Sequence, residues 1–179
     1  MADNPYALFR TEPFTVTVDG REYVFPHLPA DRWMAMLAHR DWITPVFHLI
    51  DEEAYTAFLD RAEAGGASVD DLKRIGFAVL TEAAGRPWWE AVRLAGSCNA
   101  NLGLAGTVLA RGIDPSRMSI AAFLAVVWSA IMQGRDATQR AQVEMELSLP
   151  PEDAMGDMPE PDVNELVARM RAAPGVSIG

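Results

Sequence analysis

The chain has 179 residues, of which 50% are hydrophobic, and it carries a formal net charge of −10 at pH 7. A chain of this length and composition can bury one sizeable hydrophobic core, which excludes disorder throughout. The acidic balance argues against nucleic acid or a membrane surface as a partner, because both require a basic face. The single cysteine, Cys98, excludes an internal disulfide framework and fits a reducing compartment.

The N-terminal part of the chain predicts a β-hairpin. Residues 1–12 lack the pattern of a signal peptide, and we expect a flexible N-terminus and synthesis in the cytoplasm. Polar and apolar residues alternate strictly in 14–18 and 21–25, and Asp19-Gly20 between them is a preferred pair for a type I′ turn. Helices must cover the apolar face of this hairpin, because an isolated hairpin is marginal in water.

Apolar residues at helical spacing predict a series of helices after the hairpin. We expect them at 30–40, from about residue 44 with Pro45 in the first turn, from Asp51 to 65, at 69–84, and from 87 to 110. Ser68 and Asp71 form a capping box for the helix at 69–84. The small residues at 95–106 favour a break in the last helix near Asn99, although they would also allow another helix to approach closely.

The most apolar stretch of the chain, 119–132, is expected to form a central core helix. Its ends are marked by Asp114-Pro115, with Ser119 as a second start, and by Gly134. The uncharged run of about 14 residues is short of the ~20 that a membrane span needs, so protein must cover it. Asp136 then caps a polar helix that stops at the prolines 150–151.

These elements predict a mainly α fold, in which an N-terminal β-hairpin packs on a compact multi-helix domain. The domain is expected to span 13–151, after the flexible residues 1–12. Residues 152–179 have the composition of a flexible acidic linker containing Pro and Met, followed by a short amphipathic helix. The apolar side of that helix consists of Val163, Leu166, Val167 and Met170.

Residues that could carry catalysis are isolated from one another in the sequence. The histidines are His27, His39 and His48. They fall on separate predicted elements, without the spacing that places two zinc ligands on one helix face. Cys98 has no histidine in its half of the chain to act as a base, so a small buried thiol explains it better. Asp70 and Asp71 fall in a first helical turn, where the helix dipole favours carboxylates. The sequence predicts no catalytic residues, no cofactor and no metal site.

The segment Gly85-Arg-Pro-Trp-Trp-Glu-Ala-Val-Arg-Leu94 joins the end of one predicted helix to the start of the next and carries two adjacent tryptophans. We consider it together with the hairpin, the Gly-Ile-Asp-Pro-Ser run at 112–116 and the polar helix that ends in Pro-Pro. This combination resembles the tail assembly chaperones of long-tailed phages that infect actinobacteria. The resemblance covers roughly residues 13 to 151.

The resemblance implies a small non-enzymatic protein of the host cytoplasm. Such a chaperone binds the tape measure protein and keeps it soluble while tail tube subunits polymerise around it. The implied partners are the tape measure protein, the tail tube protein and a longer form of the chain made by ribosomal frameshifting, of which this chain would be the short form. The sequence leaves open whether the chain also forms a homo-oligomer.

Binding to such a partner requires adaptable apolar side chains. The candidates are Trp88, Trp89, Met145, Met155, Met158, Val163, Leu166 and Met170. Core packing would explain the tryptophans, and loose packing in a tail would explain the methionines equally well.

Two other readings compete with the chaperone. One is a structural virion protein, a connector or tail completion component that forms a ring in the particle. The other is a small enzyme on a helical scaffold, which requires a converging cluster of buried ionisable groups.

Overall fold

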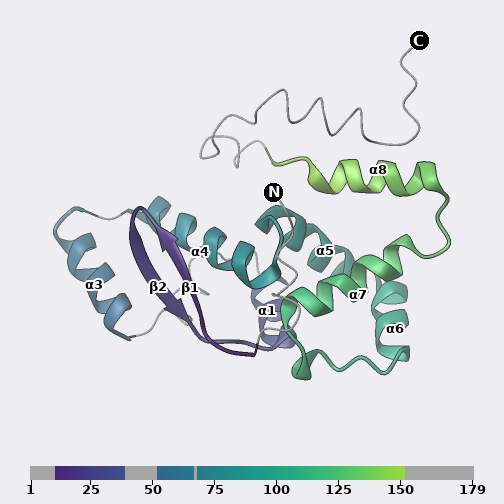
Figure 1. Ribbon diagram of the computed structural model, residues 1–179, viewed down its shortest axis with the longest axis horizontal. Coiled ribbons are helices and arrows are strands. Elements are labelled where there is room, and N and C mark those ends of the chain that lie inside the picture. The colour runs from purple at the N-terminus through teal and green to yellow at the C-terminus, as the bar shows by residue number, and fades with distance from the viewer. Residues whose placement is uncertain (1–10, 39–51, 67, 152–179) are drawn as a thin grey trace, which may run out of the picture. The chain divides into compact units, whose positions relative to one another are not determined.

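The computed structural model describes residues 11–38, 52–66 and 68–151, and Figure 1 shows their arrangement. The elements in chain order are β1 (Phe14–Val18), β2 (Arg21–Phe25), α1 (Ala30–Ala38), α3 (Glu52–Glu63), α4 (Val69–Ala84), α5 (Trp88–Ala100), α6 (Leu102–Ala110), the 3-10 turn η2 (Pro115–Arg117), α7 (Ile120–Met132) and α8 (Ala137–Ser148). The predicted fold class is confirmed, since the described chain is mainly helical with one N-terminal antiparallel hairpin. The N-terminal residues 1–10, the helix predicted from about 44 and the short helix predicted at 161–171 lie outside the described residues.

The chain divides into two units after Leu147. All of the packing described below lies in the first unit. Within the described ranges, no helix has both the length and the apolar character needed to cross a membrane.

The hairpin forms where the sequence places it, because its turn residues adopt the required backbone. Asp19 and Gly20 both have positive φ, 51° and 74°, as a type I′ turn demands. The register pairs Phe14 with Phe25, and their rings stack with centroids 6.1 Å apart. This apolar face is buried, and β1 packs on α4. A helix thus supplies the cover that the isolated hairpin would lack.

Helix α7 is the central helix of the core, as predicted. It packs against α1, α4, α5 and α6. Its fully buried side chains include Ile120, Leu124 and Val127. Burial of a side chain of this size contributes about 1.5–3 kcal/mol to folding, so this one helix provides a large part of the hydrophobic stabilisation.

The central helix begins at the later of its two predicted starts, Ser119, and not at Asp114-Pro115. Asp114 caps only the short turn η2, and α7 begins after Ser119, whose Oγ accepts the Ala122 N–H at 3.2 Å. Between them Met118 is extended, and its carbonyl accepts the Ala30 N–H at 2.9 Å. This bond joins the chain before α7 to the start of α1, which a continuous helix would prevent.

A break also divides the segment from 87 to 110, two residues later than expected. Asn101, not Asn99, separates α5 from α6. Asn101 has an extended backbone, and its side chain accepts the Leu104 N–H at 3.0 Å as the cap of α6. Asn99 itself lies within α5.

Candidate protein-binding surface

An aromatic cluster forms at the turn between α4 and α5. Gly85 ends α4 in the left-handed conformation, with φ of 65°, and Pro87 precedes the first residue of α5. Phe77 of α4 and Trp88 of α5 stack with centroids 4.0 Å apart and planes 8° apart. Trp89 meets Trp88 edge-on at 5.9 Å and 84°. The turn therefore gathers three aromatic rings from two helices.

The two tryptophans have different roles in this cluster. The backbone N–H of Trp88 donates to the Thr81 Oγ1 at 3.2 Å, and the Trp88 ring packs against the buried core as well as on Phe77. Both tryptophans are half-buried. Trp88 is therefore fixed by its own chain, which makes Trp89 the better candidate for contact with a partner.

A largely buried arginine lies in the same turn. The side chains of Arg86 and Glu90 are 15% and 18% exposed, and the Arg86 Nη1 is 3.9 Å from the Glu90 carboxylate. The Arg86 Nε is buried and has no hydrogen-bond acceptor in the described part of the chain. A buried donor left without an acceptor costs about 1–3 kcal/mol, and because this nitrogen is buried, a bound molecule could not reach it without displacing the side chains around it.

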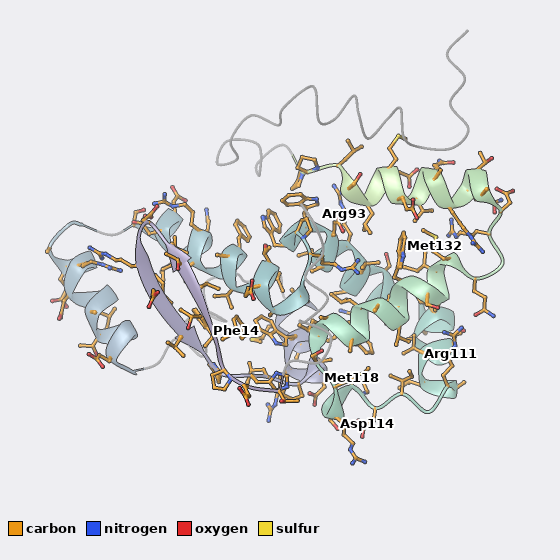
Figure 2. The ribbon with its side chains drawn as sticks, viewed as in Figure 1. Phe14, Arg93, Arg111, Asp114, Met118 and Met132 are labelled. Atoms are coloured by element: carbon orange, nitrogen blue, oxygen red, sulfur yellow. The ribbon has the colours of Figure 1, made fainter. Side chains whose placement is uncertain are left out.

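Arg93 attaches the C-terminal end of α8 to α5. Its Nη1 donates to the Glu146 carbonyl at 2.7 Å and to the Leu147 carbonyl at 2.9 Å, and Figure 2 shows Arg93 beside that end of α8. Arg93 follows Trp89 by one helical turn, so both lie on one face of α5. The contact brings α8 to the face that carries the aromatic cluster.

Met145 is the described methionine among the predicted binding residues, and it is 59% exposed. Leu147, two residues further along α8, packs against the core. Residues two apart in a helix point in nearly opposite directions, so Met145 faces solvent. The other predicted residues, Met155, Met158, Val163, Leu166 and Met170, lie outside the described residues. The structure therefore brings the turn between α4 and α5 close to the end of α8. The candidate binding residues in 152–179 stay predictions.

Sequence reasoning missed two exposed leucines. Leu102 and Leu109 of α6 are 86% and 60% exposed. Neither leucine was among the predicted binding residues. The sequence signal that could have identified the exposed side of α6 is the absence of any charged residue between Arg93 and Arg111. Most residues in this run are exposed in the structure.

The polar hollow beside the hairpin has structural contacts. It measures about 190 Å³ and lies between the hairpin, the end of α3 and the start of α4. Arg61 donates to the Tyr23 hydroxyl at 3.1 Å, and burial raises the pKa of Tyr23. Hydrogen bonds from the Ser68 N–H and from Arg74 lower the pKa of Asp71. Asp71 is one partner of the predicted capping box, so helix capping accounts for its carboxylate.

The remaining reactive groups are isolated in the described part of the chain. Cys98 is buried, and desolvation raises the pKa of its thiol, which agrees with the predicted buried structural cysteine. Within residues 11–38, 52–66 and 68–151, no three His, Cys, Asp or Glu side chains gather closely enough to hold a metal ion. His39 and His48 lie outside these ranges.

Comparison of the chain with family models, with curated proteins and with solved structures finds no match. The geometry of the surface and the sequence motifs are therefore the basis for assigning a function.

Proposed function

We propose that the chain is a tail assembly chaperone that binds the tape measure protein of a phage and keeps it soluble in the host cytoplasm. The observation that carries the proposal is the aromatic turn, by which we mean the turn between α4 and α5 where Trp88 stacks on Phe77 and meets Trp89 edge-on. The motif that resembles these chaperones, Gly85 to Leu94, holds Trp89 at the edge of an aromatic cluster.

The chemistry of this turn suits a helical partner with an apolar stripe. Trp89 supplies a large rigid ring, and Met145 on α8 supplies a flexible thioether that adapts to different sequences. An apolar binding surface on a chain with net charge −10 lets the complex stay soluble while the partner's own apolar stripe is covered.

The proposed role extends to the assembly of the tail tube around the bound partner. The tail tube protein and a longer, frameshifted form of the chain are further proposed partners. The tail residues Met155, Met158, Val163, Leu166 and Met170 would add a second apolar contact to the tape measure protein. No step of this role requires catalysis or a cofactor.

Co-expression with the tape measure protein of the same gene neighbourhood tests the proposal. We expect a soluble complex on affinity capture, and little soluble tape measure protein without this chain. Trp89→Ala should weaken the complex by about 30-fold or more, as expected for an interface anchor worth ~2 kcal/mol. Removal of 152–179 should weaken it further.

Trp128→Ala is the matched control, because Trp128 is also a half-buried tryptophan but lies on α7. It should cost stability without weakening the complex. An equally insoluble tape measure protein and no recovered complex would overturn the proposal. Recovery of the chain in purified virions would instead favour a connector or tail completion protein.

A further inference from the structure

The polar hollow beside the hairpin gathers positive charge on an acidic chain. It measures about 190 Å³, and its polar lining side chains are those of Asp19, Arg21, Tyr23, Arg61 and Asp71. Arg74 pairs with both aspartates from beside the hollow. Three arginines therefore stand against two aspartates here, whereas the whole chain has 15 basic and 25 acidic residues.

The two aspartates of the hollow already have a cation. The Arg74 Nη2 lies 3.3 Å from the Asp19 carboxylate, and the same nitrogen donates to Asp71. The Ser68 N–H also donates to the Asp71 carboxylate as part of the capping box. Arg21 and Arg61 are therefore not needed to neutralise these carboxylates, and their charge is left over in the hollow.

Tyr23 places a buried hydroxyl at the hollow, with a proton that it can donate. The residue is 6% exposed, and the Arg61 Nη2 lies 3.1 Å from its hydroxyl oxygen. Arginine can only donate, so the Tyr23 oxygen accepts and its own proton stays available. No acceptor for this proton lies in the part of the chain that the structure describes. A buried donor in this position favours a ligand that carries an acceptor oxygen.

Arg21 reaches the hollow because of its position in β2. Residues two apart in a strand lie on the same face, so Arg21 projects from the face that carries Tyr23. Burial raises the pKa of Tyr23, and the positive charge of Arg21 opposes part of that rise, as expected for near neighbours. Arg21 makes no hydrogen bond or ion pair with residues 11–38, 52–66 and 68–151. Its guanidinium is therefore a cation without a carboxylate in the described chain.

Arg61 approaches from the last turn of α3. The Gly66 N–H donates to the Arg61 carbonyl at 2.7 Å, which closes the turn after α3 and holds the backbone of Arg61 in place. A guanidinium has five N–H donors, more than the bond to Tyr23 uses. Donors from β2 and α3 are thus brought to one hollow and held there before a ligand arrives, which lowers the cost of binding.

We propose that this hollow binds a small oxyanion, a carboxylate or phosphate group held by the guanidinium groups of Arg21 and Arg61 and by the Tyr23 hydroxyl. Guanidinium groups donate to carboxylate and phosphate oxygens in strong, charge-assisted hydrogen bonds. The hollow is smaller than the ~300–1,000 Å³ of sites for drug-sized ligands, so it fits a group of a few atoms and not a nucleotide. This inference does not depend on the proposed chaperone function.

NMR titration of the full ¹⁵N-labelled chain with sodium acetate and, separately, with sodium phosphate tests the proposal. A reference titration with sodium chloride at equal ionic strength removes the general effect of salt. The amide signals of 19–23, 61–66 and 71 should shift and saturate. We expect a Kd of about 0.5–10 mM for the better ion, since the binding energy available per atom limits a four-atom ion to ~40 μM at best.

Two substitutions test the donors one at a time. Tyr23→Phe keeps the ring and removes the hydroxyl, and it should weaken binding by about 10-fold, as expected for a lost hydrogen bond to a charged group. Arg21→Met should weaken binding by a similar factor. It should also fold normally, because the Arg21 side chain is exposed and bonded to no described residue.

Arg32→Met is the matched control. Arg32 is also an exposed arginine, so its loss changes the net charge equally, but it lies on α1 and does not line the hollow. It should leave the Kd nearly unchanged, which separates a local site from general attraction of anions.

The two ions identify the ligand group. Saturation by acetate assigns the site to a carboxylate, and saturation by phosphate alone assigns it to a phosphate group. No saturation with either ion up to about 100 mM would overturn the proposal. The same holds for saturation that Tyr23→Phe and Arg21→Met leave unchanged, or that Arg32→Met weakens as much as they do.

Discussion

Replacing Arg93 with methionine should release α8 while the rest of the fold stays intact. None of the residues of α8 is buried, and an isolated helix of 12 residues is marginal in water. Leu147 of α8 packs on the core, and the Arg93 Nη1 donates hydrogen bonds to the carbonyls of Glu146 and Leu147. A cation at this end of a helix also interacts favourably with the helix dipole.

The two hydrogen bonds set the expected magnitude. A hydrogen bond to a charged group contributes about 1.5–3 kcal/mol when it is buried. The Glu146 carbonyl accepts at an exposed site and the Leu147 carbonyl at a half-buried one, so we expect a total of about 1–2 kcal/mol. This corresponds to a 5- to 30-fold increase in the opening of α8. Methionine retains an apolar stem, so the change tests the guanidinium rather than the packing.

Hydrogen exchange followed by mass spectrometry measures this opening helix by helix. Amides of α8 in Arg93→Met should exchange 5- to 30-fold faster, while those of α7 keep their protection. Arg140→Met, which removes an exposed arginine of α8 itself, should leave exchange unchanged. Equal exchange in both variants, or faster exchange in α7 as well as α8, would refute the anchoring role of Arg93.

Three further outcomes follow from the described contacts. Trp88→Ala should lower the free energy of unfolding by about 2–3 kcal/mol in urea titrations, and Trp88→Phe should recover most of the loss, because its ring packs on Phe77 and the core. The lowered pKa of Asp71 means that its carboxylate stabilises the fold above the ordinary aspartate pKa and stops doing so as the pH falls through the lowered value. The Tm of Asp71→Asn should therefore lie below that of the unaltered chain at neutral pH, and the difference should shrink below about pH 4. Because burial raises the pKa of Cys98, a thiol reagent should label it slowly in the native chain and rapidly in urea.

The sequence predicts those parts of the fold that local signals determine. The hairpin follows from alternation and from a turn pair that tolerates positive φ, and both are properties of neighbouring residues. The central helix follows from an apolar run that must be covered, and four other helices pack against it. The Ser68 and Asp71 capping box is equally local, and both of its bonds form.

Features that depend on distant residues could not be predicted in the same way. Arg93 meets the end of α8 across more than fifty residues, and Arg61 meets Tyr23 across 38. Helical spacing shows that Leu102 and Leu109 share a face, but only the packing of α6 on α5 and α7 decides which face is buried. The same holds for the aromatic turn, where stacking on Phe77 determines which tryptophan is fixed.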